Sequence, residues 1–281
     1  MIFPENIGPF ISIDEVSLSQ GELYTFITNK AGKGKKGTLI ASIKGAKSKD
    51  IIDVLHKLPN DKIKIVKEVT LDMAKNMELA IKTVFPNVKI VTDRFHVVKL
   101  VIEALQHIRI KNRWNEIDKE NEAIANAKEH GNTYFIKVLD NGDTPKQLLA
   151  RSRYLLFKNE NRWTKNQQHR AQILFKEFPQ IKIAYKHAME LRSIYDQKTI
   201  VNAKDRFINW IGKSIHMESN EFFTTAHTIY LNLDNILNFF KYRNTNANAE
   251  SFNAKIKLFR ANLRGVSDPT FFLFRLSKLF A

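Results

Sequence analysis

The chain has 281 residues, no cysteine, and 45 Lys and Arg against 29 Asp and Glu, a formal net charge of +16. The absence of cysteine excludes disulfides, thiolate zinc sites and thiol catalysis, and the positive charge favours a polyanionic partner such as DNA. The N-terminus lacks the pattern of a signal peptide, and no apolar run approaches the ~20 residues of a membrane span. We therefore expect a cytoplasmic protein with no membrane partner.

The N-terminal part of the chain predicts three strands in succession, at residues 11–18, 23–28 and 38–43. These runs are rich in β-branched and aromatic residues and are separated by glycine-containing turns. The connection at 29–37 lacks the Lys-Ser/Thr pair and the following helix of a phosphate-binding P-loop. We interpret it as a hairpin tip, and its lysines are candidates for contacts with DNA phosphates: Lys33, Lys35 and Lys36.

Helices and strands then alternate along the chain. Apolar residues recur at helical spacing over 48–58, and 63–71 has the composition of a strand. A second helix with one apolar face covers 77–85 and precedes a short strand at 88–91. The order β-β-β-α-β-α-β predicts an α/β domain with the mixed sheet of a ribonuclease-H-like core.

Beyond Arg94 the strand pattern disappears, and helical periodicity replaces it up to about Tyr242. We interpret this region as an all-α insertion between the last strand and a final core helix. The sequence thus predicts three parts: residues 1–99 form the first part of the core, 100–242 the helical insertion, and 243–281 the helices that complete the core.

Three acidic residues come from separate predicted elements: Asp14 in the first strand, Asp72 at the end of the fourth, and Glu250 at the start of a late helix. Three such carboxylates can hold two hard cations, which activate a water or a sugar hydroxyl and stabilise the in-line transition state at a phosphodiester. Taken alone, Asp72 is more simply explained as a helix N-cap. Asp93 has the same ambiguity, and His96 would share its helical face, with an ordinarily packed histidine as an equal alternative.

The helix that begins near Glu250 is amphipathic. Its apolar stripe consists of Phe252, Ile256, Phe259 and Leu263. Glu250, Asn253 and Lys257 form a polar row on roughly the opposite side. Such a row suits a helix that lies along an active site, where the glutamate binds metal and the lysine reaches a phosphate. The alternative is an exposed helix face with an ordinary charge pair.

Several of these segments resemble bacterial insertion-sequence transposases of the ISL-three family, and the resemblance covers nearly the whole chain. It is carried by the runs 13–17, 69–74, 85–99 and 248–257, and less strongly by 153–157 and 184–195. The string Asp-Arg-Phe-His-Val-Val-Lys at 93–99 is the most specific of these.

The resemblance implies a DDE-type catalytic domain in which two Mg²⁺ or Mn²⁺ ions are held by Asp14, Asp72 and Glu250. It assigns Asp93 and His96 to an accessory Asp-x-x-His motif. It also matches Lys257 to a basic residue one helical stretch after the glutamate. We expect DNA contacts by Lys257, Asn253 and Arg94 in addition to the loop lysines. A rival assignment takes Asp72 and Asp93 as the two catalytic aspartates; we prefer Asp14 and Asp72, because the metal site of such a sheet lies at adjacent central strands.

The implied activity is DNA cleavage at transposon ends followed by strand transfer into target DNA, in the cytoplasm of a bacterium and in association with its nucleoid. We expect a homo-oligomer assembled on DNA. Family members usually carry an N-terminal zinc-binding segment and a helix-turn-helix, so we expect end recognition here to come from elsewhere, for example from a separate polypeptide. Two alternatives stay open: a nuclease of the same fold without strand transfer, and an inactive DNA-binding derivative.

All three tryptophans, Trp114, Trp163 and Trp210, fall in the predicted insertion. Core packing is the simplest interpretation, because tryptophan is largely buried on average. Trp163 has the most polar neighbourhood of the three. It is therefore the candidate for stacking on an extruded DNA base near the cleavage site.

Overall fold

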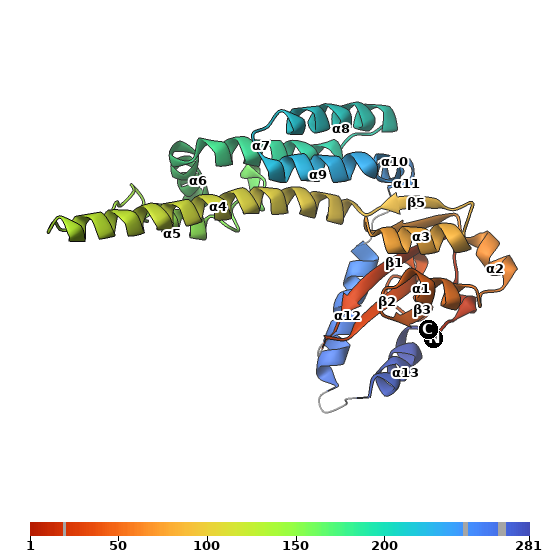
Figure 1. Ribbon diagram of the computed structural model, residues 1–281. Coiled ribbons are helices and arrows are strands. Elements are labelled where there is room, and N and C mark those ends of the chain that lie inside the picture. Colours follow the sequence, from red (N-terminus) through yellow and green to blue (C-terminus); the bar gives the residue numbers. More distant parts are fainter. Residues whose placement is uncertain (19–20, 244–246, 264–267) are drawn as a thin grey trace. The chain divides into compact units, whose positions relative to one another are not determined.

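The computed structural model describes residues 1–18, 21–243, 247–263 and 268–281, without the side chains of 242 and 247–250. The chain forms two compact units (Figure 1). The first unit comprises Met1–His96 together with Asn232–Ala281, and the second comprises Val97–Leu231. The three-part division of the chain at residues 99 and 242 stays a prediction.

The first unit contains a five-stranded mixed sheet in the order β3-β2-β1-β4-β5. The strands are β1 (Phe10–Ser17), β2 (Leu23–Asn29), β3 (Leu39–Lys44), β4 (Glu68–Leu71) and β5 (Lys89–Thr92). Strands β1, β2 and β3 pair antiparallel, whereas β1, β4 and β5 run parallel to one another. This mixed α/β arrangement is compatible with the expected ribonuclease-H-like fold.

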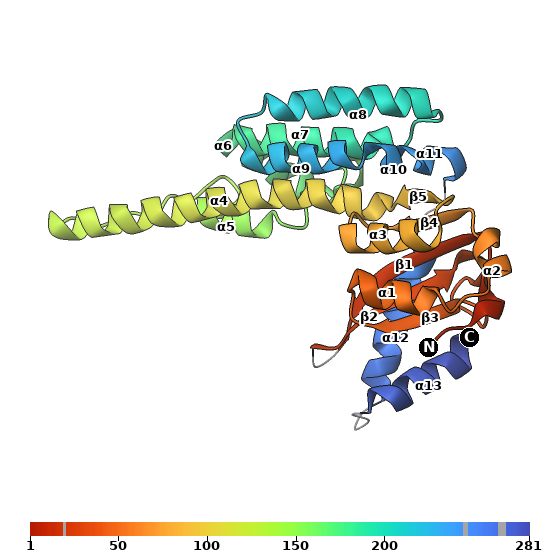
Figure 2. The ribbon, with the colours of Figure 1, turned by 45° about the vertical axis from the view of Figure 1, so that its right-hand side comes forward.

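Helices cover both faces of this sheet. Helices α1 (Ser48–Leu55) and α3 (Lys75–Val84) lie in front of it in Figure 2, and α12 (Ala247–Asn262) lies behind it. Side chains alternate across a strand, so Ile11 and Ile13 of β1 enter the core shared with α1 and α3. Val16 instead enters the core shared with α12 and α13 (Pro269–Phe280).

Two polar contacts add to the apolar packing of the first unit. The buried Arg260 of α12 donates to both carboxylate oxygens of Glu22, over 3.1 and 3.0 Å. At the β5 edge, the amide of Asn238 donates to the backbone oxygen of Ile90 over 2.8 Å. Asn238 connects α10 (Leu233–Leu237), which packs against β5, with α11 (Phe239–Tyr242).

The structure corrects the predicted strand at 63–71. Residues Asn60–Ile65 form a short helix, α2, and β4 is confined to Glu68–Leu71. The alternation of Lys62, Ile63, Lys64 and Ile65 looks strand-like in sequence. However, β4 can extend only as far as its neighbours, and pairing with β1 and β5 begins at Glu68. The preceding residues therefore have no neighbouring strand with which to pair.

The second unit is helical, and no strand occurs between residues 97 and 231, all of which the structure describes. Its helices are α4 (Arg94–Glu129, which begins in the first unit), α5 (Pro145–Arg151), α6 (Lys165–Glu177), α7 (Pro179–Ile194), α8 (Ile200–Ile215) and α9 (Asn220–Leu231). Capping boxes start α5 and α6, at Thr144 with Gln147 and at Thr164 with Gln167. No described helix is both long enough and apolar enough to cross a membrane.

A buried histidine lies in the core of the second unit. The ring of His187 stacks on Trp210 with centroids 4.5 Å apart, and its Nε2 lies 2.6 Å from Ser214 Oγ. Burial lowers the pKa of His187 to about 4 from an ordinary value of 6.5, an effect that Glu190 opposes and Lys213 reinforces. The imidazole is therefore neutral at physiological pH and acts as a packed, hydrogen-bonded core group.

We expect His187 to make this protein acid-sensitive. Its folded-state pKa lies below the unfolded one, so the unfolded chain binds the proton first, and stability falls as the pH drops from 6.5 to 4. The loss should be about 3 kcal/mol. His187→Gln should flatten this part of the pH dependence in urea unfolding, whereas His169→Gln, at an exposed position of α6, should not. Parallel curves for wild type and His187→Gln would contradict the assignment.

The attachment of α12 to the sheet can be tested in the same way. Phe252 is fully buried at 0% exposure, so Phe252→Ala should lower the free energy of unfolding by about 3–5 kcal/mol. Leu258, on the same helix, is 62% exposed, and Leu258→Ala should change it by less than about 0.5 kcal/mol. Chemical denaturation of both variants measures the difference, and equal effects would mean that α12 does not pack as described.

Candidate active site

Strand pairing brings three aspartates into one row. Strands β1 and β4 pair in parallel up to Ser12 opposite Thr70, and two further residues in this register place Asp14 opposite Asp72. Strand β5 pairs with β4 up to Thr92 opposite Leu71, and the Asp93 amide donates to the Leu71 oxygen over 2.9 Å. Residues that lie opposite each other in a sheet project from the same face. Asp14, Asp72 and Asp93 therefore form a row across β1, β4 and β5.

The row lies on the face of the sheet that α12 covers. The half-buried Asp14 accepts a 2.6 Å hydrogen bond at Oδ2 from the Nδ2 of Asn253, a residue of α12. Its other oxygen, Oδ1, accepts the backbone N–H of Glu15 over 2.8 Å. Strand and helix thus hold this carboxylate from two sides.

The acids of the row interact electrostatically. Burial raises the pKa of the Asp14 carboxyl above its ordinary value, and the negative charges of Asp72 and Asp93 raise it further. The imidazole of His96 and the amide of Glu15 act in the opposite direction. These carboxylates are clustered and partly desolvated, and they repel one another. A bound cation would reduce this repulsion.

The other two aspartates of the row, Asp72 and Asp93, each accept a local hydrogen bond. Asp72 Oδ1 accepts the backbone N–H of Ala74 over 2.8 Å, but the N-cap position of α3 belongs to Ala74 itself. Asp93 is only 3% exposed, and its Oδ1 accepts the N–H of Phe95 over 3.2 Å at the start of α4. His96 Nε2 lies 3.9 Å from Asp93 Oδ2, so these two residues share a helix face.

The third predicted acid, Glu250, lies in α12 one turn before Asn253, but its side chain is outside the described residues. Lys257 follows Asn253 by one turn and is exposed. Because Asn253 contacts Asp14, this part of α12 lies alongside the first aspartate of the row.

The predicted loop lysines lie elsewhere on the first unit. Lys33, Lys35 and Lys36 are exposed in the connection between β2 and β3. This connection follows Asn29, which pairs with Ile11, so its backbone lies at the start of β1 and not beside Asp14. The loop contacts α12 through Lys255, whose Nζ donates to the Gly34 oxygen over 2.9 Å. The other predicted DNA contact, Arg94, is half-buried at the first position of α4.

A buried lysine near the row was not predicted from the sequence. Lys30 Nζ lies 3.3 Å from Glu68 Oε1 and donates to Thr70 Oγ1, two positions before Asp72. The Glu68 side chain is 0% exposed and that of Lys30 is 10% exposed. Burial lowers the pKa of Lys30, while the charges of Glu68 and Asp93 oppose this. The available signal was Glu68, Thr70 and Asp72 at alternate positions of an otherwise apolar strand.

The donor set suits hard divalent cations, which prefer carboxylate oxygens. Asp14 and Asp72 provide such oxygens from adjacent strands. Among the described side chains, no group of three or more His, Asp or Glu lies close enough together to hold a metal ion. A complete site would therefore require at least one further ligand, and α12 is the helix that lies against this part of β1.

The Lys30–Glu68 pair gives a direct test of this buried electrostatic arrangement. Lys30→Met should lower the free energy of unfolding by about 3–5 kcal/mol, because it removes the cation from a buried carboxylate. The double variant Lys30→Met/Glu68→Met should regain most of that loss, and Lys36→Met, at an exposed loop position, should have little effect. Urea unfolding measures all three. A double variant that is no more stable than Lys30→Met would contradict the predicted coupling of the two residues.

A family model described as a transposase, of the ISL-three type, matches residues 11–276. The match runs from β1 into α13 and so includes both units. No curated protein matches the chain.

Proposed function

Because the chain belongs to the ISL-three family of transposases, which are DNA-cleaving enzymes, we propose that it cuts DNA at the ends of a mobile element and joins the ends to target DNA. We propose Asp14, Asp72 and Glu250 as its catalytic acids. The observation that supports this most is the row of aspartates across β1, β4 and β5, next to the helix that carries Glu250.

The proposed chemistry depends on divalent cations. Two Mg²⁺ or Mn²⁺ ions held by these acids would activate the attacking oxygen and stabilise the charge of the in-line transition state. Asp14 and Asp72 present their carboxylates from adjacent parallel strands, which fixes their separation. The hydrogen bond from Asn253 orients Asp14 without neutralising it.

The basic side chains near the row would bind and position DNA. Lys257 is exposed on α12 in the same polar row as Asn253, so it would contact a phosphate beside the reacting bond. Arg94 and the exposed loop lysines would hold more distant phosphates.

The proposed reaction has two steps. In cleavage, water attacks the phosphodiester and releases a 3′-hydroxyl. In joining, that hydroxyl attacks the phosphorus of a target phosphodiester and displaces the 3′-hydroxyl of the target strand. Because the attacking group is water in one step and a DNA hydroxyl in the other, neither step requires a covalent enzyme intermediate.

We propose an accessory role for Asp93 and His96, in preference to the rival pair of Asp72 and Asp93. The Asp93 side chain is almost fully buried and caps the start of α4. Asp14 is more accessible and contacts α12.

The partners we propose are transposon-end and target DNA, further copies of this chain assembled on that DNA, and a separate polypeptide that recognises the ends.

Metal-dependent nicking of supercoiled plasmid DNA tests the catalytic assignment. Wild type should nick DNA with Mg²⁺ or Mn²⁺, and Asp14→Asn, Asp72→Asn and Glu250→Gln should each reduce the rate at least about 100-fold, because metal stabilisation of transition-state charge is worth several kcal/mol. Asp53→Asn is the control, since this aspartate is exposed on α1, on the opposite face of the sheet. Full activity of Asp14→Asn together with an inactive Asp93→Asn would establish the rival pair.

The same reactions also distinguish the alternative functions. With element-end DNA and a target plasmid, a transposase yields covalently joined products, whereas a nuclease of the same fold yields only cut DNA. A protein that binds DNA but neither nicks nor joins it with either metal would be an inactive derivative, and the proposed catalytic function would then be wrong.

A further inference from the structure

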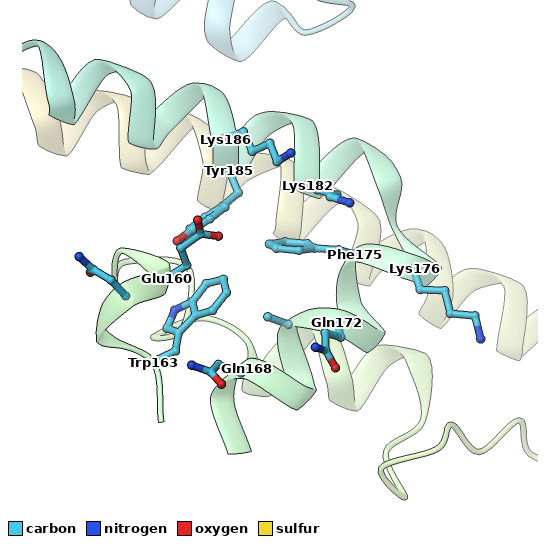
Figure 3. A pocket seen from close by; sticks show the side chains of 11 residues that line it. Glu160, Trp163, Gln168, Gln172, Phe175, Lys176, Lys182, Tyr185 and Lys186 are labelled. Carbon is cyan, nitrogen blue, oxygen red and sulfur yellow. The ribbon is translucent and has the colours of Figure 1, made fainter. Parts of the chain in front are cut away.

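The second unit contains a pocket of about 600 Å³. Its lining residues are far in sequence from Asp14, Asp72 and Glu250. It lies between α6, α7 and the short 3-10 turn η4 (Glu160–Arg162) that precedes α6 (Figure 3). Its volume falls within the roughly 300–1,000 Å³ typical of sites for small organic ligands. Every lining residue belongs to the second unit, so the pocket is complete within it.

One wall of the pocket is a cluster of three aromatic rings. Trp163 stacks on Tyr185 with centroids 5.3 Å apart and planes 29° apart. Phe175 lies 5.5 Å from Tyr185 and 6.2 Å from Trp163. Tyr185 is buried, whereas the other two rings are half-buried and so keep part of their surface open to the pocket.

The polar atoms of these rings are already engaged with the protein. The indole Nε1 of Trp163 donates to the Leu155 oxygen over 3.0 Å, and the Tyr185 hydroxyl donates to the Lys158 oxygen over 2.9 Å. These bonds fix the orientation of both rings. They leave a preformed apolar surface, suited to a flat ring that stacks and needs no hydrogen bond from the wall.

The rest of the lining offers hydrogen bonds and positive charge. In Figure 3 the amides of Gln168 and Gln172 lie below the rings, on α6. On the opposite side, Lys182 and Lys186 project from α7, and Lys176 lies near the end of α6; all three lysines are exposed. No ion pair within the described part of the chain uses any of these lysines. Against three lysines the lining has a single acid, Glu160, so the pocket favours an anionic ligand.

A planar ring, hydrogen-bonding edges and a negative charge together describe a nucleotide. Aromatic side chains stack on bases, amides read base edges, and lysines bind phosphate. We propose that this pocket binds a single unstacked nucleotide, with the base against Trp163 and Phe175 and the phosphate at Lys182 and Lys186. In DNA this would be a base extruded from its stack. The same chemistry would accept a free nucleotide. Binding at this site does not depend on the acids of the first unit.

Binding measurements in the presence of a chelator test this proposal separately from cleavage. Three probes distinguish the sources: a free deoxynucleoside monophosphate, a single-stranded oligonucleotide, and a duplex with one unpaired 2-aminopurine, whose fluorescence reports loss of stacking on its neighbours. We expect the wild type to bind at least the last two more tightly than a fully paired duplex.

Trp163→Ala should weaken this binding about 5- to 100-fold, the effect of losing one stacking partner, and Trp163→Phe should retain most of it. Lys182→Glu/Lys186→Glu, which changes only exposed side chains, should weaken it to a similar extent and keeps the test valid if Trp163→Ala does not fold. The control is Trp114→Ala, since this tryptophan of α4 is 57% exposed and does not line the pocket.

A preference for the free nucleotide over both DNA probes would identify a mononucleotide as the ligand of the same pocket. Wild-type affinity for all probes in both the Trp163 and the lysine variants would overturn the proposal. So would an equal loss in Trp114→Ala, because binding would then be spread over the surface of the unit. Loss of nicking alone, with these affinities unchanged, would concern the acids and not this pocket.

Discussion

The parallel pairing of β1 with β4 is the constraint on which the candidate site depends. Side chains alternate across a strand, so a shift of one residue in this register would turn Asp14 and Asp72 to opposite faces of the sheet. If β4 were the strand that shifted, its apolar Leu71 would turn together with Asp72, away from the core formed with α1 and α3. The same hydrophobic packing that folds the sheet therefore fixes the acids in one row.

Burying polar and charged side chains on the central strands costs free energy, because these groups lose their contacts with water. Glu68, Thr70 and Asp93 are nearly or fully buried on the side where α12 lies. Lys30, which follows β2, contacts two of them: it forms an ion pair with the buried Glu68 and donates to Thr70. Burying such a pair rarely stabilises a protein relative to apolar residues. The charge of Asp93 also acts on Lys30, so the pair is electrostatically coupled to the row of aspartates.

Much of this architecture could be predicted from local patterns. The first three strands, both helices of the α1–α3 layer and the helical second unit follow from periodicity, which depends on neighbouring residues only. The short helix α2 could not be predicted, because residues 63–65 have a strand-like sequence. They form no strand since no neighbouring strand is available to pair with them. Lys30 and the alignment of Asp93 with Asp72 were also missed, since both depend on strand order and register. The pairing of distant segments, unlike periodicity, is not encoded locally.

The hydrogen bond from Asn253 to Asp14 has a consequence for which side chains position 253 can accept. An amide N–H donates a hydrogen bond at every pH and carries no charge, so it holds the carboxylate in place while leaving its negative charge intact. A lysine or arginine there would act as a permanent counterion and compete with any incoming cation for the same oxygen. An aspartate, although of the same shape, would add a further like charge to a group of acids that already repel one another. For the proposed metal site, electrical neutrality, as much as size, is therefore the property that this helix position has to preserve.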